Sequence, residues 1–281
     1  MVKTLLAINS KFRKNYEATQ STDFIYNLPC EFKNIKSMRY CFSWFSTKPF
    51  AITPDNGSNH LKVNNTDVYV KGGDYSGQEL ATELTSQITA AGVSNVTVTY
   101  SRNLNKFVFT EVTTTNLALD FTYQDKSNCF SNEKLVDSKF LSLGWLLGFR
   151  KLTYTHAEDY ILAEDAERRH QVGINAEAEY TRYGNRYFLL YVNDFLNNHK
   201  GGVVTSYKNS TLGEGNILAQ IKFHYDPGDK FVSTETVSDV AREYAGKSDI
   251  NRLHIKLLDE FGRVISLNNT DFTVSIELET D

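Results

Sequence analysis

The chain has 281 residues and a net charge of −4 at pH 7, with 41% hydrophobic and 13% aromatic residues. This is enough apolar material for one large or two medium cores. The sequence contains neither a dense Lys/Arg cluster nor a run of about 20 apolar residues. We therefore expect a globular protein with no direct nucleic-acid contact and no transmembrane segment.

Strand patterns dominate most of the chain. Residues 23–29 and 35–45 are rich in aromatic and β-branched residues and predict two consecutive strands joined by a short polar link. Residues 185–195 are apolar on both faces and predict a central strand, and residues 216–225 predict another.

Two further strands are predicted near the end of the sequence. Residues 252–260 place Leu253, Ile255 and Leu257 on one face. Residues 271–279 alternate between apolar and polar side chains, which is typical of a strand with one wet face. Gly and paired Asn residues between them favour turns, so we expect these two segments to be antiparallel partners.

Residues 51 to about 125 read as a ββαββ module. A strand pair is predicted around residues 61–70, and a hairpin is predicted from the alternating residues 96–100 and 106–111. Between them, Ser76 and Glu79 have the spacing of a capping box. The helix that follows is indicated by apolar residues at helical spacing and by a glycine placed to close it, namely Leu80, Leu84, Ile88 and Gly92.

The segment SLGWLLGFRK, residues 142–151, is too short and too closely flanked by charges to be a membrane anchor. Its two glycines, Gly144 and Gly148, disfavour a helix. We expect a strand or hooked loop in which Trp145 and Phe149 anchor a core. An exposed docking peptide is the alternative.

These elements predict a mainly β protein: an antiparallel, jelly-roll-like β-sandwich with an inserted ββαββ module. We expect an N-terminal arm at residues 1–22 and an outer β-sandwich domain formed by residues 23–50 and 150–281. The inserted α+β module would occupy residues 51–149 and end in the SLGWLLGFRK junction.

The sequence offers little that is typical of an enzyme. The common nucleophile, zinc and nucleotide motifs do not occur. The strongest candidate for catalysis or cation binding is the acidic and histidine-rich segment 156–170, whose members are His156, Glu158, Asp159, Glu164, Asp165 and His170. A charged loop or short helix with internal ion pairs explains the same residues. We expect no catalytic residue, no cofactor and no metal site.

Several strings in this sequence resemble a known family when taken in order. They are INSKFRKN and STDFIYNLP near the start, GDYSGQEL, SLGWLLGFRK and RYFLLYVNDF in the middle, and AREYAGKSDINRLHIKLLDEFGRVISLNNTDFTVSIELET at the end. Together they are similar to the minor capsid proteins of nucleocytoplasmic large DNA viruses, and the last forty residues carry most of the similarity. Ala245 departs from the family pattern, where a bulkier residue is usual, and so do Lys247 and Ser248, where Gly-Pro is common.

The resemblance implies a non-enzymatic virion protein that binds the major capsid protein and other capsid components of a large icosahedral double-stranded DNA virus. It leaves a homo-oligomer open. Three cysteines, which cannot all pair, and an N-terminus without a secretory-signal pattern lead us to expect synthesis in the host cytoplasm. From the N-terminal arm and the REYAG segment we predict these partner-binding residues: Leu5, Leu6, Ile8, Phe12, Arg13, Arg242 and Tyr244. A fibre-like or carbohydrate-recognising module is the alternative, and a hydrolase using residues 156–170 is the third hypothesis.

Overall fold

The structure is a computed structural model and describes residues 2–47, 49–112, 116–122, 138–161, 172–182, 184, 187–196, 198–207, 210–212, 215–224, 233–236 and 240–280. The chain forms two compact units, built from residues 1–49 and 185–281 and from residues 50–128 and 136–184. The inserted unit therefore ends at Gly184 and not at residue 149 as we expected. Residues 150–184 belong to it because Tyr154, Ile174 and Tyr180 pack into its core.

Among the described residues, unit 1 contains the 3-10 helices η1 and η2 and the longest strands. Its elements are β1 (Val2–Asn9), η1 (Ser10–Phe12), η2 (Tyr16–Ala18), β2 (Asp23–Phe45), β11 (Tyr187–Asn193), β12 (His199–Lys200), β13 (Thr205–Tyr207), β14 (Ser210–Leu212), β15 (Ile217–His224), β16 (Ser233–Thr236), β17 (Arg242–Leu258) and β18 (Phe272–Thr280).

An antiparallel sheet of eight strands forms the frame of unit 1. Its order is β1-β18-β2-β17-β11-β15-β16, and β12 also pairs with β17. The predicted central strand at 185–195 is confirmed, since β11 lies between β17 and β15. The strand predicted at 216–225 is confirmed as β15.

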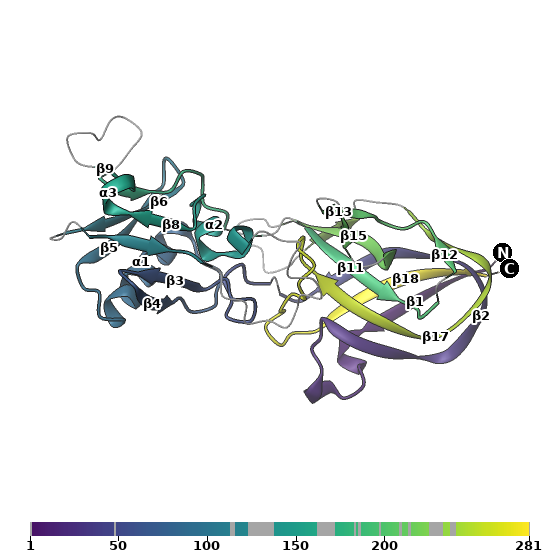
Figure 1. Cartoon of the computed structure of the whole chain (residues 1–281). Helices are drawn as coiled ribbons and strands as arrows, with labels where there is room; N and C mark the ends of the chain where they lie inside the picture. The colour runs from purple at the N-terminus through teal and green to yellow at the C-terminus, as the bar shows by residue number, and fades with distance from the viewer. Residues whose placement is uncertain are drawn as a thin grey trace. The chain divides into compact units, whose positions relative to one another are not determined.

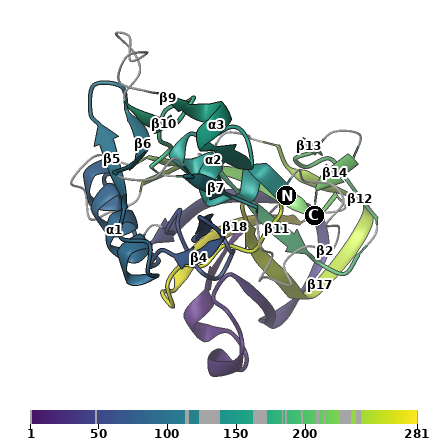
Figure 2. The same cartoon turned by 60° about the vertical axis from the view of Figure 1, so that its left-hand side comes forward.

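The two strands predicted at 23–29 and 35–45 are one continuous strand, β2, which runs beside β17 in Figure 2. The residues between them, 30–34, do not form the predicted polar link. Instead, the register against β17 shifts at three points between Glu243 and Arg252, and Asn34 adopts a positive φ of 56°. Bulges of this kind bend a strand without ending it.

The apolar periodicity of β17 and β18 is confirmed, because Leu253, Ile255 and Leu257 are buried and so are Phe272, Val274, Ile276 and Leu278. The expected pairing between the two strands is wrong. β18 pairs with β1 and β2, and β17 pairs with β2 and β11. The long strand β2 lies between them, since its first half borders β17 and its second half borders β18.

The sheet of unit 1 curls around its core. β16 is the last strand in the hydrogen-bonded order, and β15, β11 and β17 separate it from β2. It nevertheless contacts β2. The core includes stacked rings of Phe45 and Phe272, whose centroids are 5.3 Å apart, with Phe24 edge-on to Phe272. Both termini lie at the same end of this unit (Figure 1), as the Val2–Thr280 pairing requires. The predicted fold class, a mainly β, antiparallel, jelly-roll-like sandwich, is confirmed.

In the part of unit 2 that the structure describes, there are two four-stranded sheets, three α-helices and one 3-10 helix. The sheet orders are β4-β3-β7-β8 and β5-β6-β10-β9. The elements are β3 (His60–Val63), β4 (Thr66–Tyr69), α1 (Gly77–Ala90), β5 (Val96–Ser101), β6 (Lys106–Glu111), β7 (Ala118–Asp120), η3 (Ser138–Leu141), α2 (Leu143–Leu147), β8 (Thr153–Thr155), α3 (His156–Asp159), β9 (Tyr160–Ile161) and β10 (Gly173–Asn175).

Helix α1 forms where the sequence predicts it. The Ser76 hydroxyl accepts a hydrogen bond from the Glu79 amide at 3.3 Å, and the Glu79 carboxylate accepts one from the Ser76 amide at 2.8 Å. Leu80, Leu84 and Ile88 are buried on one face. The capping box and the predicted strand pairs on either side of the helix, β3-β4 and β5-β6, are all confirmed.

The segment 142–151 forms the short helix α2, so the expectation of a strand or hooked loop is wrong. Ser142 caps its start by accepting a hydrogen bond from the Trp145 amide, and Gly148 ends it with a φ of 97°. The glycine that disfavours a helix interior here provides the left-handed C-terminal residue. Phe149 is buried as predicted, whereas Trp145 is only partly buried and stacks under the Arg150 guanidinium at 4.0 Å.

Candidate interaction surface

The N-terminal segment is part of the folded sheet. Strand β1 pairs with β18 over its full length, from Val2–Thr280 to Asn9–Thr273, without a register shift. Leu6 and Ile8 are buried in the core of unit 1, while Leu5 on the opposite face is 57% exposed. The expectation of a free arm is therefore wrong, because alternate residues of β1 complete the core.

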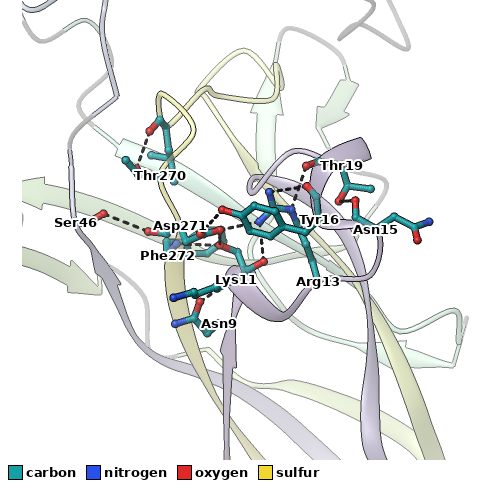
Figure 3. Close-up of polar contacts among 12 residues, drawn as sticks. Asn9, Lys11, Arg13, Asn15, Tyr16, Thr19, Ser46, Thr270, Asp271 and Phe272 are labelled. Atoms are coloured by element: carbon teal, nitrogen blue, oxygen red, sulfur yellow. Dashed lines mark hydrogen bonds and ion pairs between the residues drawn. The ribbon is translucent and has the colours of Figure 1, made fainter.

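Residues after β1 are held by Asp271 (Figure 3). The Asp271 carboxylate accepts hydrogen bonds from the Ser10 hydroxyl at 2.8 Å, from Arg13 at 2.7 Å and from the Tyr16 hydroxyl at 3.0 Å. Arg13 also donates to the backbone oxygens of Ser10, Tyr16 and Thr19. We call this group, Ser10, Arg13, Tyr16 and Asp271, the Asp271 cluster.

The Asp271 cluster buries the side chain of Arg13 and leaves that of Phe12 accessible. The Arg13 side chain is only 7% exposed and its guanidinium lies 3.9 Å from the centre of the Tyr16 ring. Phe12, in contrast, is 71% exposed. Among the predicted partner-binding residues of the N-terminal segment, Leu5 and Phe12 face solvent, and Leu6, Ile8 and Arg13 are occupied inside the unit.

The outward face of β1, β18 and β2 carries exposed apolar side chains. Pairing places Ala7, Ser275 and Phe42 in one row across these three strands. Leu5 precedes Ala7 by two residues and Trp44 follows Phe42 by two, so both lie on the same face. Phe42 and Trp44 are each more than half exposed. We call Leu5, Ala7, Phe42 and Trp44 the outer patch.

One border of the outer patch carries a small network of charged side chains. The Glu277 carboxylate, opposite Leu5, pairs with Lys3 and with Arg39, both at 2.9 Å. Hydrogen bonds from Arg39 and Lys3 hold the pKa of Glu277 below its ordinary value. The outer patch therefore offers apolar contact area beside an ion network in which one carboxylate binds two cationic side chains, which leaves one positive charge in excess among these three groups.

Arg242 and Tyr244, which we predicted to contact partners, are buried instead. Arg242 donates to the Val192 carbonyl at 2.8 Å and to Asp194 at 3.1 Å, and the side chains of Arg242 and Asp194 are both 0% exposed. The Tyr244 hydroxyl donates to the same Asp194 oxygen at 2.5 Å. Burial, with the negative charge of Asp194, raises the pKa of Tyr244. These residues join β17 to the end of β11 and cannot anchor a partner.

The sequence carries a signal for this burial that the prediction overlooked. Arg242 and Tyr244 are two residues apart in a strand, so they share a face, and Ile250 and other apolar residues further along β17 fill the core. A buried arginine needs a carboxylate. Asp194, directly after the apolar run of β11, is that partner, but its proximity depends on strand order and not on local sequence.

The proposed acidic and histidine-rich segment is only partly described. His156 stacks on Tyr160 with ring centroids 4.2 Å apart, and Asp159 binds Lys151 at 2.6 Å and the Thr155 amide at 3.0 Å. Glu164, Asp165 and His170 lie outside the described residues. Within the part of the chain that the structure describes, no three His, Cys, Asp or Glu residues are grouped to hold a metal, and no helix is long and apolar enough to cross a membrane.

Unit 2 presents a surface hollow beside α1 and β5. It is lined by Thr82, Thr85, Ser86, Thr89, Ala90 and Val98. This lining contains neither an ionisable group nor an aromatic ring, so it provides no group for acid–base chemistry and no ring on which a sugar could stack.

No protein-family model and no curated protein matches the chain. Among solved structures, the crystal structure of the mavirus penton protein is similar at 12% identity, with 100% of both chains covered and a TM-score of 0.48. The structure of the Sputnik virophage by cryo-EM is similar at 11% identity, with 99% of this chain and 98% of that chain covered and a TM-score of 0.40.

Proposed function

We propose that this chain is a non-enzymatic structural protein of a virus particle: a minor capsid protein that binds and stabilises the major capsid lattice or the vertices of a large icosahedral double-stranded DNA virus. The observation that carries the proposal is the outer patch. Exposed apolar groups that lie together on a folded surface are typical of protein–protein contact sites. Aromatic side chains such as Phe42 and Trp44 are among those that contribute most to binding at such sites.

The family resemblance supports a capsid component as the partner, and the residues of its motifs have structural roles in unit 1. Arg242 and Tyr244 of the REYAG segment bind Asp194. In LLDEFGR, Asp259 and Arg263 form a buried ion pair at 2.7 Å. In LNNTD, Asp271 organises the Asp271 cluster. These residues stabilise the frame of unit 1, which supports a structural role for the motifs.

The proposal is tested with particles of the virus that encodes the chain. Variants Phe42→Ser and Trp44→Ser should weaken co-assembly with the major capsid protein, because they remove apolar contact area while leaving the core intact. The matched control is Ile25→Ser, which changes another exposed apolar residue of β2, 44% exposed, outside the outer patch. Equal incorporation of all three variants into particles would contradict the proposal.

A carbohydrate-recognising module remains the second candidate, because Phe42 and Trp44 are exposed two residues apart on one face and rings in this arrangement can stack on sugars. A glycan array distinguishes the two candidates. Saturable binding to one glycan class, lost in Trp44→Ser, would favour the binding module. Cross-links between Lys3 or Lys11 and the major capsid protein in purified particles would favour the capsid role.

A further inference from the structure

Strand β1 forms an edge of the eight-stranded sheet. It pairs with β18 on one side, and among the described residues no strand pairs with its other side. In an antiparallel strand the backbone N–H and C=O groups point alternately to the two sides. About half of the polar backbone groups of Val2–Asn9 are therefore directed away from β18.

This edge lacks the features that protect edge strands from pairing with other chains. Such strands are usually short, or carry proline, bulges or several charges. The sequence VKTLLAIN has eight residues, no proline and an unbroken register, and its one charged residue, Lys3, is bound to Glu277. Val2 and Leu5 are apolar and 58% and 57% exposed. The opposite end of the sheet is different, because β16 lies against β2.

The edge is also held in place before any partner arrives. β18 fixes one side of β1 along its whole length, and the Asp271 cluster fixes the residues that follow Asn9. A strand ordered in advance loses little conformational entropy when another strand is added to it. Regularity, exposure and order together make β1 a template for strand addition.

We propose that the occupant of this edge is β1 of a second copy of the chain, paired antiparallel about a two-fold axis at Leu5. Residues opposite each other in an antiparallel pair point to the same face. This register places Leu5 against Leu5 of the partner and Thr4 against Leu6. Lys3 lies opposite Ala7 and never opposite another Lys3, so no like charges meet.

The pairing extends existing features of the surface. A two-fold contact uses the same residues on both copies, so one self-compatible strand is sufficient. Leu5 and Ala7 of both copies lie on the outward face, where the two outer patches would become one apolar surface crossing the dimer. The inference does not depend on the capsid role, because it requires only two copies of this chain.

Cysteine cross-linking of the full-length chain tests the register. In a background with Cys30→Ser, Cys41→Ser and Cys129→Ser, Leu5→Cys should form a disulfide-linked dimer under mild oxidation, since directly opposed strand residues lie within the Cα separation that a disulfide spans, about 4.4–6.8 Å. Phe12→Cys is the matched control, because it is more exposed than Leu5 but lies outside β1. Cross-linking that is no faster for Leu5→Cys than for Phe12→Cys would overturn the proposal.

Sedimentation analysis provides an independent measurement. The unmodified chain should show a concentration-dependent monomer–dimer equilibrium, and Leu5→Lys should shift it to monomer, because two lysines would face each other at the axis. The unfolding temperature of the Leu5→Lys monomer should stay close to that of the parent, since Leu5 is outside the core. A parent chain that remains monomeric at all concentrations overturns the proposal, and the edge would then be available to a strand of a different protein.

Discussion

Arg13 donates a 2.7 Å hydrogen bond to Asp271, which is 258 residues further along the chain. This contact closes the N-terminal segment onto the start of β18, and the Ser10 hydroxyl completes it by accepting from the Phe272 amide at 3.0 Å. Hydrogen bonds thus hold the N-terminal segment of unit 1 against the start of its last strand.

Deletion of residues 1–22 should strongly destabilise unit 1. The deletion removes Leu6 and Ile8 from the core, and truncation of one such buried side chain to alanine alone costs about 2–5 kcal/mol. It also exposes β18 as a new edge. We expect insolubility or a large fall in the thermal unfolding temperature. Phe12→Ser is the control, because an exposed substitution should change stability by less than about 0.5 kcal/mol. Unchanged unfolding of the truncated chain would restore the idea of a free arm.

Asp194→Ala should cost about 3–5 kcal/mol in chemical denaturation, because it leaves the buried Arg242 guanidinium without its carboxylate. Tyr244→Phe removes one hydrogen bond to a charged acceptor and should cost less, about 1.5–3 kcal/mol. The double variant Arg242→Met with Asp194→Leu should be less destabilised than Asp194→Ala. The opposite result, with the double variant the least stable of the three, would mean that the attraction between Arg242 and Asp194 itself stabilises the folded state.

The stability of unit 1 should decrease on mild acidification through His199. Burial, together with the positive charge of Arg242, lowers the pKa of His199 below its ordinary value of 6.5, against opposing effects of Asp194 and Asn216. Between pH 6.5 and the lower folded-state pKa, the unfolded chain therefore binds a proton at this histidine more readily than the folded chain does. The free energy of unfolding decreases as the pH is lowered through this range. Above this pH range, His199 does not make the free energy of unfolding depend on pH.

Denaturation across this pH range measures the effect, with His199→Gln as the matched variant. The variant should show a shallower loss of stability between pH 6.5 and the folded-state pKa of His199. NMR titration of the His199 ring gives that pKa directly. Parallel stability curves for the two proteins, or a ring that titrates above 6.5, would contradict the prediction.

Ser76→Ala should destabilise unit 2 by about 1 kcal/mol, because it removes the hydroxyl that accepts from the Glu79 amide. Leu84→Ala should cost more, about 2–5 kcal/mol, since this side chain is fully buried on the inner face of α1. Glu83→Ala, in the same helix, is a control for helix composition. Chemical denaturation should rank the losses as Leu84, then Ser76, then Glu83.

Two glycines with similar backbone angles should respond differently to alanine. Gly92 has a φ of 94° and no atom near the position of an added Cβ, so Gly92→Ala should cost about 1–2 kcal/mol for the left-handed conformation alone. At Gly148, with a φ of 97°, the added Cβ would lie 2.1 Å from the Ala178 carbonyl oxygen. Gly148→Ala should therefore disrupt the folded unit 2. Comparable unfolding temperatures for the two variants would contradict this contact.

The sequence predicted those elements whose signals are local. The capping box at Ser76 and Glu79 is confirmed, and so is the burial of alternate apolar residues from Phe272 to Leu278, although Ser275 between them is also buried. For α2 the local signal was present but was interpreted wrongly. Glycine disfavours a helix interior, yet Gly148 is the residue that ends α2, and both roles follow from the same freedom to adopt a positive φ.

Only the tertiary structure decided which segments meet. Asp194 and Arg242, or Arg13 and Asp271, attract each other wherever they are close, but strand order alone brings them together. The alternation of β1 shows that Leu6 and Ile8 share a face, yet whether that face meets solvent or a core depends on β18 being its neighbour. Periodicity is a property of the chain and was readable from it. Pairing depends on closing long loops around one core, for which short stretches of sequence contain no signal.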